Sequence, residues 1–123
     1  MAIARQGYRN VGITQISEGT LTENFGEVSV PNNTETVLAT FTVPASKFVR
    51  IVGLYGEGGT DGIFRLYIDS TKIWQGRNAW TSRNVFSNRQ YDAQAGEVVE
   101  LRVIQQSTTH TFSGVVWGYE NNA

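Results

Sequence analysis

Short segments in which apolar and polar side chains alternate recur between residues 37 and 119 of this chain. The clearest examples are residues 64–68 (FRLYI), 98–103 (VVELRV) and 112–119 (FSGVVWGY). Successive side chains of a β-strand point to opposite faces of a sheet, so a period of two predicts strands with one buried face. Turn-forming residues separate the segments about every ten residues, and no segment of useful length has a helical period. The sequence therefore predicts an all-β protein.

Short strands at this spacing are typical of antiparallel β-sandwiches. We predict an antiparallel β-sandwich of about eight strands, and a jelly roll is the commonest arrangement of that kind. An immunoglobulin-like topology is the alternative. The sequence has no detectable internal repeat, which disfavours a propeller or a solenoid.

The first 24 residues differ from the rest of the chain. Glycine and asparagine interrupt this polar stretch, and its apolar side chains have no sustained helical period. We predict an extended N-terminal arm (residues 1–24) followed by a β-sandwich domain (residues 25–123). A disordered terminus is the alternative interpretation of the arm. The apolar residues that favour an arm lying along a sheet or a neighbouring subunit are Ile3, Tyr8, Val11, Ile13, Ile16 and Leu21.

Apolar side chains at alternate strand positions define an expected core. In residues 36–43 the side chains expected to share one face are Val37, Ala39, Phe41 and Val43. The side chains expected to be buried are Phe41, Ile51, Phe64, Leu66, Ile68, Leu101, Val103 and Phe112. The chain contains no cysteine, which excludes disulfides, thiolate metal ligands and cysteine nucleophiles. Packing alone must therefore hold this core together.

The composition of the chain narrows the classes of function. With 40% apolar residues, 17% charged residues and a net charge of -1, the chain fits neither a disordered polyelectrolyte nor a basic nucleic-acid binder. No apolar run is long enough to span a bilayer, and the N-terminus has no apolar run followed by a cleavage site. We therefore expect a protein made in a cytoplasm, with neither nucleic acid nor membrane as a partner.

No set of side chains in the sequence matches a catalytic pattern. A hydrolytic triad needs a histidine between a nucleophile and a carboxylate, and the single histidine, His110, lies in a polar stretch where we expect it to be exposed. The carboxylates that a glycosidase would need fall mostly in turns or at outward strand positions. These candidates are Glu57, Asp61, Asp69, Asp92, Glu97 and Glu100. We expect no enzymatic activity.

The glycine-rich residues 57–62 offer carboxylate and carbonyl oxygens that calcium accepts as ligands. They lack the dense acidic spacing of an EF-hand, so we interpret them as a plain connection between strands. No metal and no cofactor is expected.

Aromatic and basic side chains are interleaved in residues 74–91. Because tryptophan and arginine anchor many protein interfaces, this region and the arm supply candidate interface residues. These candidates are Tyr8, Ile13, Arg77, Trp80 and Arg83. An alternative is an aromatic platform on which a sugar ring stacks, formed by Trp74, Trp80 and Tyr91. A third interpretation places Trp74 and Phe86 in the core, with the arginines on a solvated face.

Four segments of the chain resemble small virion proteins of tailed bacteriophages, which are β-sandwich modules that decorate or cement capsids or occur in tails and fibres. The segments are residues 43–51 (VPASKFVRI), 64–69 (FRLYID), 95–103 (AGEVVELRV) and 112–119 (FSGVVWGY). The resemblance covers residues 37–119, rests on no invariant motif and does not extend to the arm.

The resemblance implies a jelly-roll-like capsid decoration or cement protein that binds between capsid subunits. Its partner would be the major capsid protein and its location the virion. It would form a homo-oligomer, with a trimer favoured, and would need no active site. Similar sandwiches serve as carbohydrate-binding modules, so the alternative is a lectin or a phage receptor-binding or tail part.

Overall fold

The computed structural model of the protein describes residues 19–58, 62–77, 81–85, 91–106 and 109–123, with the backbone alone for residues 81–85. The described residues form nine β-strands and contain no helix. The strands are β1 (Thr20–Val30), β2 (Thr36–Thr42), β3 (Lys47–Glu57), β4 (Gly62–Ile68), β5 (Thr71–Arg77), β6 (Thr81–Val85), β7 (Tyr91–Gln94), β8 (Val98–Gln105) and β9 (His110–Asn122).

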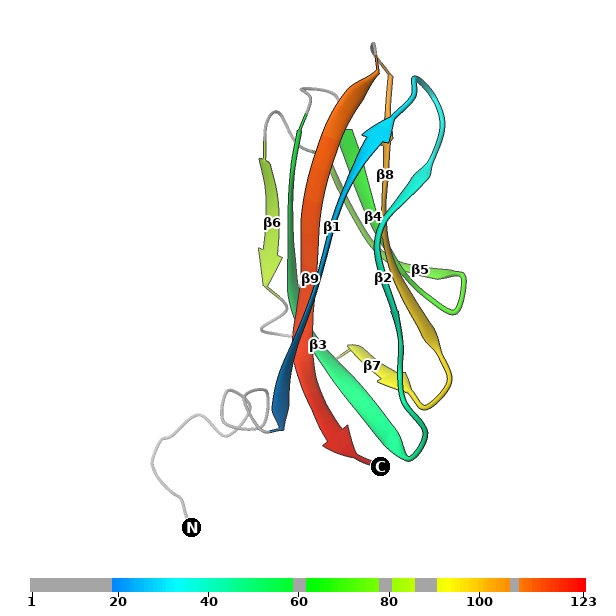
Figure 1. The fold of residues 1–123 in the computed structure, drawn as a ribbon, viewed down its shortest axis with the longest axis vertical. Coiled ribbons are helices and arrows are strands. Elements are labelled where there is room, and N and C mark those ends of the chain that lie inside the picture. The colour runs from blue at the N-terminus through cyan, green and yellow to red at the C-terminus, as the bar shows by residue number, and fades with distance from the viewer. Residues whose placement is uncertain (1–18, 59–61, 78–80, 86–90, 107–108) are drawn as a thin grey trace.

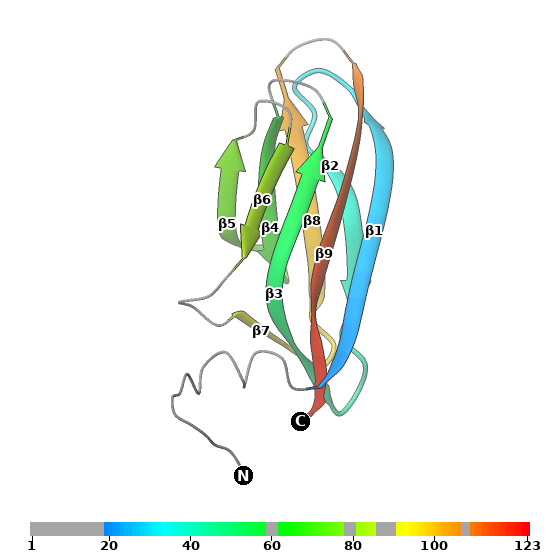
Figure 2. The same cartoon turned by 90° about the vertical axis from the view of Figure 1, so that its left-hand side faces the viewer.

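The strands form two antiparallel sheets, which Figure 1 shows side by side and Figure 2 shows one in front of the other. The first sheet has the order β1–β9–β3–β6, and β7 also pairs with β3. The second sheet has the order β2–β8–β4–β5. Strands β6 and β7 pair with successive parts of β3, residues 53–57 and 48–51, so together they occupy one edge position. Two four-stranded layers in this order make a jelly roll, which confirms the predicted fold class and excludes the immunoglobulin-like alternative.

The first sheet begins earlier in the chain than the sequence predicted. Strand β1 starts at Thr20 and pairs with β9 along its whole length, from Thr20 opposite Glu120 to Val30 opposite His110. Residues 20–24, assigned to the arm from the sequence, therefore belong to the sandwich. The boundary was missed because the apolar side chains of this stretch point outward, so the usual pattern of a core-facing strand is absent. The arm itself, residues 1–18, lies outside the described residues.

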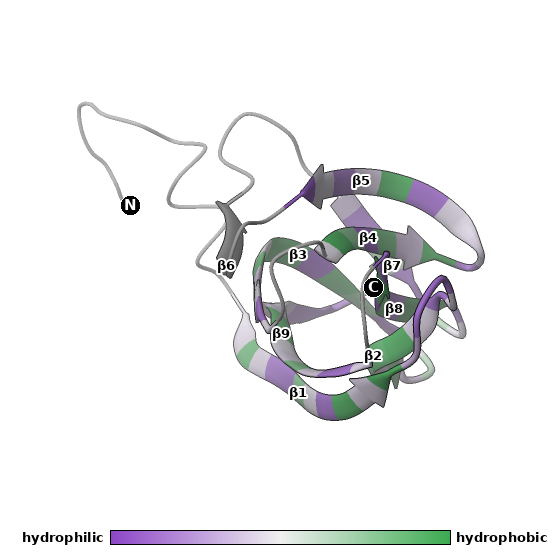
Figure 3. Ribbon diagram, turned by 90° about the horizontal axis from the view of Figure 1, so that it is seen from above, coloured by the Kyte–Doolittle hydropathy of each residue, from purple (hydrophilic) through white to green (hydrophobic). Residues whose placement is uncertain are grey.

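The core fills the space between the two sheets, which Figure 3 shows from above. Phe64 of β4 and Phe112 of β9 meet there edge to face, with ring centroids 5.9 Å apart. The members of the predicted core that are buried are Ile51, Phe64, Leu66, Leu101, Val103 and Phe112. Phe41 and Ile68 are half-buried and pack against this core, because they lie at the ends of β2 and β4.

A β-bulge in β2 changes which side chains of that strand face the core. The register with β8 shifts between Val37 and Ala39, and Leu38 and Ala39 are both buried. Val37 is instead 40% exposed. The prediction that Val37 shares a face with Ala39 is therefore wrong, because the extra residue reverses the alternation. The bulge also touches β1, since any Cβ at Gly26 would overlap the carbonyl oxygen of Leu38.

A polar network centred on Glu35 covers the outer face of the second sheet. The Glu35 carboxylate accepts hydrogen bonds from Arg65 (2.8 Å) and the Tyr67 hydroxyl (3.1 Å). It also accepts one from Arg102 (3.1 Å), whose guanidinium lies 4.0 Å from the centroid of the Tyr67 ring. Arg102 donates a further hydrogen bond to Glu100 (3.0 Å). Burial alone would raise the pKa of Glu35, but the hydrogen bonds outweigh this effect and hold the pKa below its ordinary value.

Truncation of a core leucine tests the strand assignment. Leu66 and Leu101 are fully buried and lie opposite each other on β4 and β8. Leu66→Ala or Leu101→Ala should lower the free energy of unfolding by about 2–5 kcal/mol, because each leaves a cavity. The exposed control Val37→Ala should change it by about 0.5 kcal/mol or less. Urea denaturation measures both values, and leucine variants as stable as the wild type would contradict the assignment.

The lowered pKa of Glu35 predicts a contribution to stability that depends on pH. Such a carboxyl stabilises the fold above its unfolded pKa, about 4.3 for glutamate, and this contribution is lost as the pH falls through the folded value. On acidification from neutral pH, Glu35→Gln should therefore lose less free energy of unfolding than the wild type. Glu27→Gln is the matched control, because Glu27 is exposed and forms no ion pair with a described residue. Identical pH profiles for wild type and Glu35→Gln would refute this role.

Candidate functional site

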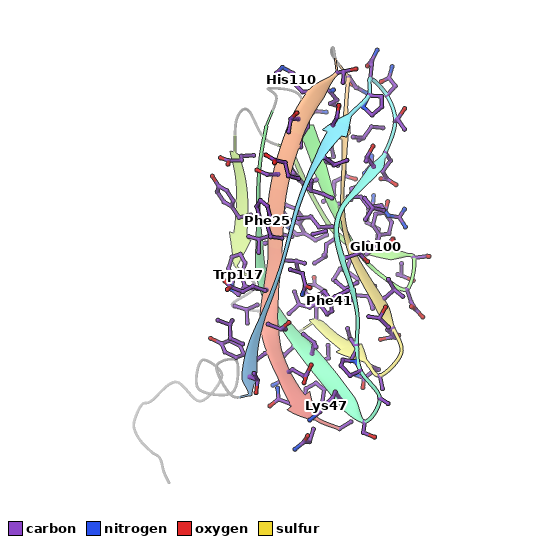
Figure 4. The ribbon with its side chains drawn as sticks, in the orientation of Figure 1. Phe25, Phe41, Lys47, Glu100, His110 and Trp117 are labelled. Atoms are coloured by element: carbon purple, nitrogen blue, oxygen red, sulfur yellow. The ribbon has the colours of Figure 1, made fainter. Side chains whose placement is uncertain are left out.

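The outer face of the first sheet carries large apolar side chains. In β9 the inward positions Gly114, Val116 and Gly118 are buried, so the residues between them point outward. In β1 the same alternation directs further apolar residues to this side, and in β3 the register shift between Ile51 and Gly53 leaves Tyr55 opposite the outward Val115. We call this surface the β1–β9–β3 face, and its apolar side chains are Leu21, Phe25, Val52, Tyr55, Val115, Trp117 and Tyr119. Figure 4 shows Phe25 and Trp117 on the first sheet, with Glu100 on the second.

The register of the strands places these side chains next to one another. Phe25 is opposite Val115, and Val115 is opposite Tyr55 on its other side. Leu21 is opposite Tyr119 in the same way. Side chains opposite each other on neighbouring antiparallel strands have Cβ atoms about 4.5–5.5 Å apart. The apolar residues therefore form a continuous strip across three strands.

Two side chains of the face are unusually exposed. Phe25 is 71% exposed and Leu21 is 51% exposed, and both lie on the edge strand β1. The third large exposed hydrophobic residue in the described part of the chain, Val37, lies on the other sheet. Burying an apolar side chain of this size completely gains about 1.5–3 kcal/mol relative to full exposure. The face is therefore the strongest candidate interaction surface among the described residues.

Carboxylates lie beside the apolar side chains of the β1–β9–β3 face. Glu23 lies between Leu21 and Phe25 on β1, opposite Trp117, and Glu27 and Glu57 lie further along β1 and β3. All three are exposed and form no ion pair with a described residue. The charge of Arg50 on β3 is paired, because Arg50 donates two hydrogen bonds to the Asp92 carboxylate of β7 (2.9 and 3.0 Å). The described side chains thus combine an apolar strip with unpaired carboxylates beside it.

The residues of β1 contain a sequence signal for this face. Leu21 and Phe25 occupy odd positions, whereas Val28 and Val30 of the same strand occupy even positions. Val30 is buried and Val28 packs against the core, so Leu21 and Phe25 must point to solvent. Apolar residues at both parities of one strand indicate a strand with two apolar faces. The odd or even numbering alone does not tell which of the two sides of the strand is turned toward the core.

The predicted interface residues are only partly within the described structure. Arg77 is exposed at the end of β5, in the second sheet. Arg83 lies in β6 of the first sheet, where its backbone is opposite Tyr55, and its side chain is not described. The structure therefore places these two arginines on different sheets. Tyr8, Ile13 and Trp80 lie outside the described residues.

The described members of the predicted sugar platform pack against the core. Trp74 lies on β5 of the second sheet and Tyr91 on β7 of the first, and both are half-buried. The Trp74 ring lies over Gly76, where any Cβ would overlap it. This placement agrees with the interpretation of Trp74 as a core residue. Trp80 lies outside the described residues.

Four of the candidate catalytic carboxylates have ion-pair or hydrogen-bond partners of their own. His110 is exposed at the start of β9. Asp92 and Glu100 are ion-paired with arginines. Asp69 and Glu97 each accept a hydrogen bond from a backbone amide near a turn (2.9 and 2.6 Å). Each of these four carboxylates thus has a local structural role.

The candidate calcium loop, residues 57–62, is described only in part. Of the candidate calcium loop, residues 59–61 lie outside the described residues. The described residues contain no group of three or more His, Cys, Asp or Glu side chains that could hold a metal ion. They also contain no helix with the length and apolar character needed to cross a membrane.

Distant structural likenesses to solved proteins include a phage capsid chain and a carbohydrate esterase. No protein-family model matches the chain, and no curated protein matches it. A chain of the cyanophage Pam1 capsid asymmetric unit is 9% identical, with a TM-score of 0.49, over 97% of this chain and 94% of that chain. A family two carbohydrate esterase from Cellvibrio japonicus is 12% identical, with a TM-score of 0.33, over 82% of this chain and 35% of that chain. At these identities and TM-scores neither likeness bears on function.

Proposed function

We propose that this protein is a structural virion protein of a tailed phage and, more narrowly, a capsid decoration or cement protein. The observation that carries the proposal is the β1–β9–β3 face, an exposed apolar surface suited to adhesion. The resemblance of residues 37–119 to small phage virion proteins supports the same assignment. In this role the protein binds between capsid subunits, resides in the virion and catalyses no reaction.

The construction of the face suits adhesion. Its strands are long, with 11 residues in β1 and in β3 and 13 in β9, and β9 pairs with both neighbours. A surface held this firmly loses little conformational entropy when a partner docks. Tyrosine and tryptophan, here Tyr55, Trp117 and Tyr119, are the residue types that supply much of the binding energy at protein interfaces. A partner that covered Phe25 would add apolar burial at the edge of the strip.

The proposed partner is the major capsid protein. We propose that the protein acts as a homo-oligomer, with a trimer favoured, because closed symmetry is common among soluble oligomers. Several copies held together also bind a repeating shell more tightly than one copy does, since each bound copy raises the effective concentration of the next. The role requires no cofactor, metal, nucleic acid or membrane.

Serine substitutions on the face test the proposed attachment. Leu21→Ser combined with Phe25→Ser should weaken binding to capsids that lack this protein by about tenfold or more, or about 1.4 kcal/mol. Thermal stability should change little, because both side chains are largely exposed. Val37→Ser is the matched control, since it removes an exposed hydrophobic residue from the other sheet. Co-sedimentation with capsids measures the affinity, and wild-type binding by the double variant would rule out attachment through this face.

A carbohydrate-binding module is the second candidate function, and the same face favours it. Tyr55, Trp117 and Tyr119 point outward from neighbouring strands, where aromatic rings have one apolar body and a polar group for hydrogen bonding. Sugar rings stack on such aromatic surfaces. The site would differ from the platform predicted from the sequence, whose described members pack against the core.

A glycan array separates the two functions. A lectin would bind particular glycans, and Trp117→Ala should then lower its affinity by about tenfold or more, close to 1.4 kcal/mol. Trp74→Phe is the control, because it keeps an aromatic ring at a half-buried position away from the face. For a decoration protein we expect no glycan binding above background. Reproducible binding that depends on Trp117 would replace the capsid proposal with the carbohydrate one.

A further inference from the structure

A segment of 18 residues leaves the sandwich at one end of the β1–β9–β3 face. Gly19, the first described residue, has a φ of 103° and packs against the end of β9. A Cβ at Gly19 would lie 2.5 Å from the carbonyl oxygen of Glu120. Strand β1 then begins at Thr20, and Leu21 is the first apolar side chain of the face. Residues 1–18 therefore depart directly beside this surface.

This segment can reach well beyond the face of its own copy. An extended chain spans about 3.3–3.6 Å per residue, so residues 1–18 can span about 60 Å. The stretch of β1 from Leu21 to Glu27 measures only about 20 Å at the rise of a β-strand. The segment is therefore long enough to lie on a second copy of the protein.

The side chains of residues 1–18 complement those of the face. Two arginines, Arg5 and Arg9, outnumber the single carboxylate of Glu18. The apolar side chains of the segment are Ile3, Tyr8, Val11, Ile13 and Ile16. The face offers an apolar strip with the carboxylates of Glu23, Glu27 and Glu57 beside it. A polar segment with spaced apolar side chains and two cations would thus meet an apolar surface with anions, which favours association and selects the partner.

We infer that residues 1–18 of one copy bind the β1–β9–β3 face of a neighbouring copy. Direct contact between two such faces is disfavoured, because it would bring the carboxylates of both faces together. Binding of the segment to the face of its own copy is the competing arrangement, and it would leave the protein monomeric. The inference rests on the proposed function and deepens it: the segment of a neighbouring copy binds at Leu21 and Phe25, and the oligomer so formed attaches to the shell with several copies at once, so that loss of these contacts also weakens capsid attachment.

Sedimentation velocity of the full-length protein, without capsids, tests the inference. The wild type should self-associate as its concentration rises. Ile13→Ser, in the segment, and Phe25→Ser, on the face, should each raise the dissociation constant by about tenfold or more. Val37→Ser, on the other sheet, should leave it unchanged. A synthetic peptide of residues 1–18, added in excess, should dissociate the wild-type oligomer.

The salt dependence of self-association tests the contribution of the two arginines in the segment. Arg5→Gln combined with Arg9→Gln should weaken self-association and reduce its dependence on salt, because the ion pairs screened by salt are then missing. Thermal denaturation of every variant verifies that the sandwich remains folded.

Three results would overturn the inference. A wild type that stays monomeric at all concentrations would contradict the binding of residues 1–18 to a neighbouring copy. The segment would then be unbound or would cover the face of its own copy. Ile13→Ser that associates like the wild type removes the segment from the contact. Loss of association in Phe25→Ser but not in Ile13→Ser would indicate direct contact between faces. Capsid binding is measured separately, so self-association without capsid binding would refute the proposed function and leave this inference standing.

Discussion

Strand β9 holds the first sheet together, because it pairs with β1 on one side and with β3 on the other over most of its length. Its inward positions alternate large and small residues: Phe112 and Val116 fill the core, whereas Gly114 and Gly118 leave space. A Cβ at Gly114 would lie 2.8 Å from the side chain of Leu38, on the opposite sheet. The second sheet can therefore approach this closely only because β9 presents glycine there. A buried hydrogen bond from the side chain of Gln105 on β8 to a carbonyl of β1 (2.6 Å) also joins the two sheets.

The outer face of the first sheet is unusual because β9 carries large apolar side chains there. Large side chains of this strand between its two inward glycines, Val115 and Trp117, point away from the core, and Tyr119 follows on the same side. The outer face of the second sheet is different, because the network around Glu35 pairs the carboxylates of Glu35 and Glu100 with Arg65 and Arg102. One sandwich thus has an outer face that carries a network of ion pairs and an outer face that carries an exposed apolar strip.

This difference gives the molecule two chemically distinct sides. The exposed apolar strip is the side that favours contact with a partner. In the proposed role the first sheet would face neighbouring protein subunits and the second sheet would face solvent. Neither side needs a catalytic group for such a role, which depends on shape, apolar area and the charge beside the strip.

The sequence by itself determined the elements that depend on local alternation, because the period of two is a property of each strand alone. Strands such as residues 98–105 were predictable in this way, as was most of the core from Ile51 to Phe112. Only the tertiary structure decided what depends on contacts between distant segments. The bulge that exposes Val37 arises in the register between β2 and β8, and the inclusion of residues 20–24 arises in the pairing of β1 with β9. The β1–β9–β3 face also depends on contacts between distant segments. Strand β1 has apolar residues at both odd and even positions, so the side that faces the core is known only when the second sheet covers it.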